Sequence, residues 1–473
     1  MFIIMVVVFV LGYLAIALEH PLHVDKAIPA LAIGTLLWVL YIFGAYDIFT
    51  SGLSEAWNSY VHGSEGHGEL GIQAMRHFIV DIEIIRHLGE ISEILFFLLG
   101  AMTIVEVIDK HDGFKIITDK IKTLKKVKLL WILSFLTFFM SAALDNLTTT
   151  IVMVALLRKL IDDKETRWFF AAMVVLAANA GGAWSPIGDV TTIMLWIGGQ
   201  VTTLSIIARV ILPSLFTMIV PLALLSITMK GEVARPKIDA KEKIYTTPFE
   251  RKLFLIMGVG GLLFVPVFKT ITHLPPYLGM LLSLSVIWLV SEVQHKDKPD
   301  DIKKRLKVIY ILQKVDTPTI FFFLGILSAV AALQSAGQLT VLASYLDEHL
   351  GNIFLIDMAI GVLSAVVDNV PLVAGAIGMY PIENAASMAA MTDPAAIEYA
   401  SNFVQDGLFW EFLAYCAGTG GSILIIGSAA GVAAMGMEKI DFIWYMKRIS
   451  LLALLGYVAG AGVYYLQALF LHH

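Results

Sequence analysis

The chain has 473 residues, of which 58% are hydrophobic and only 15% are charged, and its mean hydropathy is +0.80. Roughly a quarter of the residues in an ordinary soluble domain are charged, so the composition excludes that class. The net charge is −6 with one cysteine, which argues against nucleic acid as a partner and against a disulfide framework. Apolar runs of about 20 residues, long enough to cross a lipid bilayer, recur along the chain. We therefore predict an all-α polytopic membrane protein.

Residues 1–90 are expected to hold two spans, near residues 1–18 and 27–44, followed by an amphipathic interfacial stretch. The first span lacks a basic segment before it, which favours a retained helix over a cleaved signal. A third span is expected to start at Glu90 and to end near residue 109. Glu90 and Glu93 would then lie at a membrane entrance and could guide ions or protons, although a solvated helix end explains them equally well.

Residues 141–150 place a carboxylate, an amide and several hydroxyl groups inside an apolar run over residues 129–157. An ionised carboxylate in hydrocarbon costs several kcal/mol, so it is tolerated only where it faces a cavity, a partner or an ion. Seven lysines precede this run over residues 110–128, and basic residues follow it from Arg158. Positive charge marks the cytoplasmic side. The pattern predicts a re-entrant hairpin over 129–157 with Asp145 and Asn146 at its tip.

The next apolar run, residues 168–197, is interrupted over residues 179–192 by three glycines and a proline. This interruption predicts a discontinuous helix, which completes a first repeat over residues 91–229 together with a span near 203–229. Residues 230–315 are expected to link the two halves. They hold two spans, about 251–269 and 276–292, and two basic loops.

Residues 316–473 repeat the pattern of the first half. Asp368 and Asn369 lie 223 positions after Asp145 and Asn146, in a predicted hairpin over 353–380. A second broken helix is expected over 408–437, and residues 381–407 read as an inserted loop. Lysine and arginine are absent between residues 314 and 439, so the second hairpin lacks the positive flanks of the first. This asymmetry is typical of two inverted structural repeats.

Inverted repeats with broken helices bring a substrate site to the middle of the membrane. The polar residues of the two predicted hairpin tips and the two predicted helix breaks all offer oxygen ligands, which hard cations prefer, and these segments contain no lysine or arginine to balance an anion. Desolvation favours the neutral form of a carboxyl group, so the same group could hold either a proton or a metal ion. The candidate carriers are Asp145, Asp368 and Asp189. The candidate cation ligands are Asn146, Thr148, Asn179, Thr191, Thr192, Ser364, Asn369, Thr419, Ser422 and Ser428.

Simpler interpretations stay open at this point. Asp189 could serve only as the cap of the second half-helix, and Thr148, Thr191 and Thr192 could bond within their own helices. Two glycine pairs, Gly181-Gly182 and Gly420-Gly421, could be helix-packing contacts. A membrane-embedded enzyme would need a nucleophile beside a base, and no histidine lies near the serines of the motifs. We expect neither enzymatic activity nor a cofactor.

Three motifs, residues 144–149, 179–192 and 367–371, resemble those of the NhaD-type bacterial sodium/proton antiporters, whose wider superfamily includes arsenite and dicarboxylate carriers. The resemblance covers nearly the whole chain from Glu90 onward. It implies proton-driven efflux of Na⁺, and often Li⁺, for pH homeostasis. It also implies a multi-pass homodimer in the bacterial inner membrane, with a scaffold domain and a transport domain that moves like an elevator.

On this reading, Asp145 and Asp368 alternate between a proton and Na⁺, with Asn146 and Asn369 as further ligands. The alternative is an arsenite or organic-anion carrier on the same fold. Dicarboxylate carriers of the superfamily have Ser-Asn-Thr at the hairpin tips, whereas an aspartate precedes each asparagine here. This difference argues against a carboxylate substrate.

Overall fold

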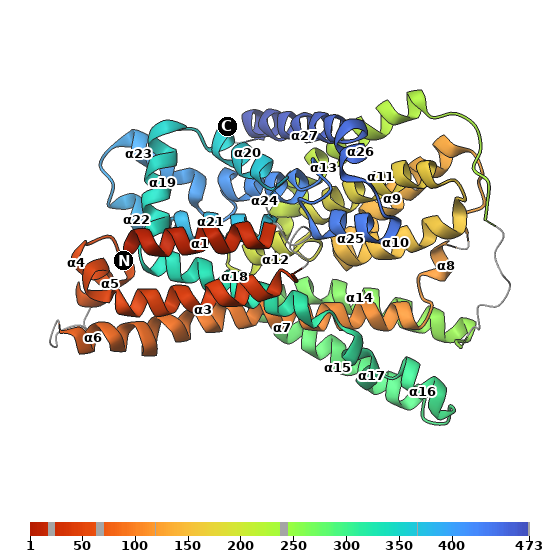
Figure 1. Ribbon diagram of the computed structural model, residues 1–473, viewed down its shortest axis with the longest axis horizontal. Coiled ribbons are helices and arrows are strands. Elements are labelled where there is room, and N and C mark those ends of the chain that lie inside the picture. Colours follow the sequence, from red (N-terminus) through yellow and green to blue (C-terminus); the bar gives the residue numbers. More distant parts are fainter. Residues whose placement is uncertain (18–23, 63–70, 119, 237–244, 367, 472–473) are drawn as a thin grey trace. The chain divides into compact units, whose positions relative to one another are not determined.

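The computed structural model describes residues 1–17, 24–62, 71–118, 120–236, 245–366 and 368–471, and these residues are almost entirely helical (Figure 1). Among them, seven helices are long and apolar enough to cross a membrane. The prediction of a polytopic α-helical membrane protein is confirmed. The chain divides into two compact units, each built from separate segments. The first comprises Met1–Phe96, Asp316–Ile356 and Val370–Ile382, and the second comprises Phe97–Val315, Asp357–Asn369 and Glu383–His473.

The first unit is organised around the packing of α3 (Ala27–Phe43) on α18 (Thr317–Ser335). The indole of Trp38 donates to the Ser328 carbonyl, and the Tyr41 hydroxyl donates to the Ser335 carbonyl, at 3.0 and 3.2 Å. Segments almost 300 residues apart in the sequence therefore form one core. The unit also contains α1 (Phe2–Ala17), α4 (Ala45–Thr50), α5 (Glu55–His62) and α19 (Gln338–His349).

A continuous helical run of 39 residues extends from Ile72 to Lys110. It consists of α6 (Ile72–His77), the π-helical η1 (Phe78–Glu83) and α7 (Ile84–Lys110). The expectation that this span starts at Glu90 was therefore wrong. The charges that interrupt its apolar pattern pair along the helix, because Arg86 lies 3.1 Å from Glu83 and 3.5 Å from Glu90. Pairing lowers the cost of keeping such residues in a membrane helix.

In the second unit, the first hairpin consists of α9 (Lys126–Leu144) and α10 (Asn146–Leu160), with only Asp145 between them. The first broken helix consists of α11 (Lys164–Ala183) and α12 (Val190–Ile197). The second consists of α24 (Leu408–Gly420) and α25 (Ala429–Glu438). Both interruptions fall in the glycine-rich motifs. The unit also contains α13 (Thr203–Thr228), α14 (Pro248–Thr272), α15 (Pro276–Gln294), α26 (Phe442–Arg448) and α27 (Ser450–Leu471), and Figure 1 shows α13 beside α27.

The second predicted hairpin consists of two helices, α20 (Ile353–Leu363) and α21 (Asn369–Met379). Residues 353–356 and 370–382 belong to the first unit and residues 357–369 to the second. The two segments expected to be loops contain short helices. These are α16 (Asp300–Leu306), α17 (Val308–Ile311) and η2 (Leu312–Lys314) before the second repeat, and α22 (Ala385–Ala389), α23 (Pro394–Ala400) and η3 (Ser401–Phe403) within the insertion.

The first hairpin touches its broken helix backbone to backbone. A Cβ atom on Gly181 would overlap the carbonyl of Phe138, so only glycine permits this approach. The hydroxyl of Ser141, one turn further along α9, donates to the Ala178 carbonyl at 2.6 Å.

The same pair of contacts recurs between α20 and α24. A Cβ atom on Gly420 would overlap the carbonyl of Gly361, and the Ser364 hydroxyl donates to the Ala417 carbonyl at 3.1 Å. The residues of α20 lie 223 positions, and those of α24 lie 239 positions, after their counterparts. Both hairpins are thus anchored on their broken helices in the same way.

Two buried histidines lie just beyond the ends of α7 and α15. Nδ1 of His111 bonds to the Val107 carbonyl at 2.6 Å, and Nδ1 of His295 bonds to the Ser291 carbonyl at 2.7 Å. Their Nε2 atoms are 3.3 Å apart, and the His111 ring stacks on Phe254. Burial lowers the pKa of His111 to about 3 and also lowers the pKa of His295. Both imidazoles are therefore neutral at physiological pH.

Candidate functional site

Asp145 forms the tip of the first hairpin and shapes it with its own side chain. Its φ of +83° lies in a region that costs a residue with a side chain roughly 1–3 kcal/mol. The carboxylate offsets part of this cost by capping α10. One oxygen accepts the Thr148 N–H at 2.7 Å, and the other accepts the Thr148 hydroxyl at 2.8 Å. Asp145 is half-buried.

Asn146 joins this tip to both parts of the first broken helix. Its side-chain nitrogen donates to Asp189 Oδ2 at 2.5 Å and to Asn179 Oδ1 at 3.1 Å. All three residues are buried, with exposed fractions of 6% or less. The hairpin tip therefore sits at the break between α11 and α12, as its polar sequence requires.

Asp189 caps α12 and also accepts a hydrogen bond from one asparagine of each hairpin. Its Oδ1 accepts the N–H and the hydroxyl of Thr191 at 2.9 and 2.7 Å, which is the capping role left open by the sequence. The amide of Asn369, at the start of the second hairpin's α21, reaches the same oxygen at 3.5 Å, a long hydrogen bond. Capping therefore accounts for only part of what this carboxylate does.

Asn179 connects the two broken helices. Its side-chain nitrogen donates to the hydroxyls of Ser422 and Ser428, each at 2.9 Å. Ser428 in turn caps α25 by accepting the Gly431 N–H at 3.1 Å. Residues that the sequence placed in separate halves of the chain thus share one hydrogen-bond network.

Three candidate hydroxyls donate to backbone carbonyls. Thr192 donates to Ala183 at 3.4 Å, and Thr419 donates to Tyr415 one turn back in α24 at 2.7 Å. Ser364 is the third, through the contact that anchors the second hairpin. Thr419 therefore bonds within its own helix, whereas Thr192 reaches across the break to α11. Each hydroxyl oxygen keeps acceptor capacity for a cation after donating its hydrogen.

The carboxyl groups of the site lie close enough to affect one another. Asp145 and Asp368 both lie within electrostatic range of Asp189. Like charges in a poorly hydrated site repel strongly, so such a cluster is stable when a proton or a cation offsets part of its charge. Carboxylate, amide and hydroxyl oxygens are suitable ligands for a hard cation. All these residues belong to the second unit.

Sequence reasoning missed the residues that hold this arrangement together. Ser185 donates to the Ala142 carbonyl at 2.5 Å, next to the Ser141 bond described above. Glu438 at the end of α25 is buried and accepts from Arg158 at 2.7 Å and from Arg167 at 2.9 Å, which ties α10 and α11 to α25. Ser141 and Ser185 lie within the polar stretches 141–150 and 179–192, whereas nothing in the sequence pairs Glu438 with two arginines 271 and 280 residues earlier.

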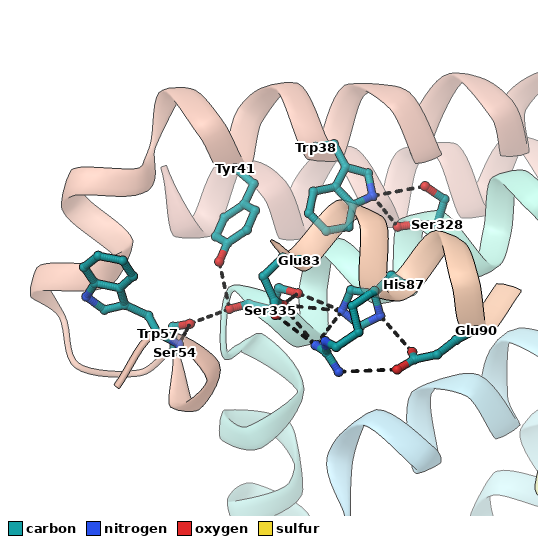
Figure 2. A network of polar contacts seen from close by, with 10 residues as sticks. Trp38, Tyr41, Ser54, Trp57, Glu83, His87, Glu90, Ser328 and Ser335 are labelled. Carbon is teal, nitrogen blue, oxygen red and sulfur yellow. Dashed lines mark hydrogen bonds and ion pairs between the residues drawn. The ribbon is translucent and has the colours of Figure 1, made fainter. Parts of the chain in front are cut away.

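Glu90 lies within a polar network in the first unit (Figure 2) and not at a helix end. Its carboxylate is 3.2 Å from His87 Nδ1, and His87 Nε2 is 3.0 Å from the Ser335 hydroxyl. That hydroxyl donates to the buried Glu83 at 2.5 Å. Positions 83, 87 and 90 share one helix face, and this spacing could have predicted the network from the sequence. We instead expected Glu83 in the interfacial stretch. Glu93 is half-buried, and an entrance role for Glu90 and Glu93 stays a prediction.

Comparison with known proteins identifies the family of this chain. A family model described as a citrate transporter matches residues 1–401. Sodium/proton antiporters 1 and 2 of Arabidopsis thaliana are 45% and 43% identical to this chain over 97% of its length, which covers 71% and 98% of theirs. The Na⁺/H⁺ antiporter NhaD of Vibrio cholerae is 28% identical over 96% of this chain and 89% of its own. The chain belongs to the NhaD-type sodium/proton antiporter family.

This membership confirms the resemblance seen in the three motifs. The NhaD-type relatives are named as antiporters and not as enzymes, so the prediction of a transporter is confirmed. Relatives carrying the antiporter name occur in a plant and in bacteria. The multi-pass membrane location is supported by the seven apolar helices, whereas the bacterial inner membrane stays a prediction.

Proposed function

We propose that this protein exchanges cytoplasmic Na⁺ for external protons. The observation that carries the proposal is the convergence of Asp145, Asp189 and Asp368 within electrostatic range in one compact unit. The names of its relatives support the choice of Na⁺ and H⁺ as cargo. Li⁺ as a second cargo is proposed from the family resemblance alone.

Na⁺ and protons would compete for the same carboxyl groups. In this mechanism, Asp145 and Asp368 bind Na⁺ when ionised and release it when they are protonated. The amide nitrogen of Asn146 donates to Asp189 and Asn179. These two hydrogen bonds fix the plane of the amide, and its oxygen stays available as a ligand for a cation. Asp189 positions the two asparagines through its hydrogen bonds. Because proton binding and Na⁺ binding exclude each other, each ion drives release of the other.

The cation site is suited to moving as one body. Asn179 joins α11 to Ser422 and Ser428, and Glu438 joins α10 and α11 to α25. We infer an elevator-type movement in which the hairpin tips and the broken helices travel together as one body and carry the cation site with them. The homodimer and a separate scaffold domain are part of this proposal and follow from the family resemblance.

The alternative function is transport of an organic anion, since the matching family model is described as a citrate transporter. An anionic substrate would need cationic or strongly donating groups around it. The hydrogen-bonded site instead brings together aspartate, asparagine, serine and threonine side chains. This composition favours the cation.

The exchange can be tested in inside-out vesicles that hold a proton gradient and a pH-sensitive dye. NaCl added to wild-type vesicles should collapse the gradient, and Asp145→Asn and Asp368→Asn should abolish this response at normal expression. Asp162→Asn is the matched control, because Asp162 is an exposed carboxylate of the same unit, and it should behave as wild type. Citrate uptake without any response to Na⁺ or Li⁺ would instead establish the anion carrier.

A further inference from the structure

We propose that Asp357 is a further proton-binding residue of this transporter, which releases and regains one proton in each exchange cycle apart from the cation site. The proposal rests on the sodium/proton exchange proposed above. Asp357 lies on α20, the first arm of the second hairpin, and is the only ionisable residue of that otherwise apolar helix. No motif of the sequence includes it.

The environment of Asp357 differs from that of every carboxyl group in the cation site. Its side chain is fully buried, with an exposed fraction of 0%. Both of its oxygens lack a hydrogen-bond partner among the described residues. Asp189, by contrast, accepts hydrogen bonds from three different residues. An ionisable side chain at membrane depth without a partner is unusual and marks a functional position.

The titratable groups facing Asp357 are weak acids. Cys416 on α24 and Tyr457 and Tyr464 on α27 lie within electrostatic range of it. The Tyr457 hydroxyl donates to the carbonyl of the neighbouring Met358 at 3.1 Å. The Tyr464 hydroxyl is 2.9 Å from Glu411, a further buried carboxyl group. These neighbours cannot balance a negative charge on Asp357, so its carboxyl group is protonated in this conformation.

A purely structural role explains this residue poorly. A protonated carboxyl group without a partner is costlier to bury than an aliphatic side chain of similar size, because its polar atoms lose their bonds to water. Glu411, in the same region, avoids that cost by bonding to Tyr464 and to the Ser205 hydroxyl. Asp357 has no such hydrogen bonds in this conformation. A second conformation in which water reaches the carboxyl group would let it release its proton, and this gives the residue a function.

The position of Asp357 couples it to the cation site. Asp357 lies seven residues before Ser364, roughly 10 Å along a helix. Between them, the backbone of Gly361 touches Cys416 and Gly420 of α24, directly before the break that leads to Ser422. A change at the hairpin tip therefore moves the arm that carries Asp357. When water reaches this arm, the O–H bond of the carboxyl group breaks and its proton passes to water; a proton from the opposite side restores the neutral acid.

Protonation of Asp357 can be observed directly by infrared difference spectroscopy on the purified full-length protein. We expect the carbonyl band of a protonated, buried carboxyl group in wild type, a change in that band when Na⁺ is added, and loss of both in Asp357→Asn. A spectrum of Asp357→Asn identical to that of wild type would overturn the proposal. So would an Asp357 band that does not respond to Na⁺.

The coupling is measured in proteoliposomes by balancing imposed Na⁺ and H⁺ gradients until net movement stops, which gives the number of protons exchanged per Na⁺. Asp357→Asn should lower this number by one and keep Na⁺/Na⁺ exchange, whereas Asp357→Glu should retain the wild-type number. Glu411→Gln is the matched control, because it makes the same chemical change in a hydrogen-bonded carboxyl group, and it should leave the number unchanged.

The two proposals fail in different ways. An unchanged proton number in Asp357→Asn, with a wild type that exchanges Na⁺ for protons, overturns the role of Asp357 alone. A wild type that moves no protons with Na⁺ overturns the proposed function and this inference with it. Asp357→Glu keeps the test decisive if Asp357→Asn fails to fold, because loss of coupling in a folded carboxylate variant contradicts the proposal.

Discussion

Replacement of Asn179 by alanine tests whether one side chain holds the two broken helices together. The change removes three buried hydrogen bonds, one from Asn146 at 3.1 Å and one each to Ser422 and Ser428 at 2.9 Å. Each contributes about 1 kcal/mol net. We therefore expect Asn179→Ala to lower the free energy of unfolding by roughly 2–4 kcal/mol and to abolish transport.

The free energy of unfolding can be measured by equilibrium denaturation of the purified protein in mixed micelles. Asn58→Ala is the control, because Asn58 makes one exposed hydrogen bond, to the Gly52 carbonyl at 2.8 Å. This control should cost less than about 1 kcal/mol. Asn179→Asp should retain most of the stability, since its oxygens can accept from Asn146 and from both serines, and should change the affinity for Na⁺ by adding a carboxylate. An Asn179→Ala protein as stable as the Asn58→Ala control would refute the bridging role.

Three further predictions concern packing and charge in the second unit. Gly181→Ala should prevent folding or expression, because its Cβ would overlap a carbonyl of α9, whereas Gly260→Ala, with nothing within 4 Å of the new Cβ, should express normally. Glu438→Gln should cost about 1–3 kcal/mol of unfolding free energy at neutral pH, because two partly exposed arginines lose their hydrogen bonds to a buried carboxylate, and an unchanged denaturation midpoint would contradict this. His111 has a folded-state pKa of about 3, below the value of about 6.5 in an unfolded chain, so only the unfolded chain binds a proton between these values and stability falls as pH drops through that window. His111→Phe should flatten this acid-side loss in denaturation curves recorded against pH, and an unchanged slope would argue against a neutral buried histidine.

The breaks in the helices were predictable because each carries its own chemical signal. Asp145 interrupts an apolar run with a charge, and residues 184–189 and 421–428 interrupt their helices with glycine, serine or proline. Most of the residues around Asp189 were predictable because they are polar side chains inside apolar runs. Family resemblance added the identity of the cargo, which oxygen ligands alone do not specify.

The remaining features depend on contacts between distant segments. The helix begins at Ile72, whereas the sequence predicts a start at Glu90. Charged residues such as Glu83 and Arg86 are typical of the membrane interface, and the prediction therefore places them outside the span. Their pairing lowers the cost of placing them within the helix. The reach of Asn179 to Ser422 and Ser428 requires two segments about 245 residues apart to be packed together, which local sequence does not encode. Asp357 carried the same signal as Asp145, an acid in an apolar helix, but lay outside the motifs.

Competition between Na⁺ and protons for the aspartates is tested most directly by proton release from the purified protein in weakly buffered detergent solution. A pH-sensitive dye reports the protons that appear when NaCl is added, and choline chloride serves as the control for ionic strength. Wild type should release protons with Na⁺ only, Asp145→Asn and Asp368→Asn should each release fewer, and the double variant should release the fewest. No release from folded wild-type protein, or equal release from wild type and the double variant, would contradict a shared site for Na⁺ and protons on these residues.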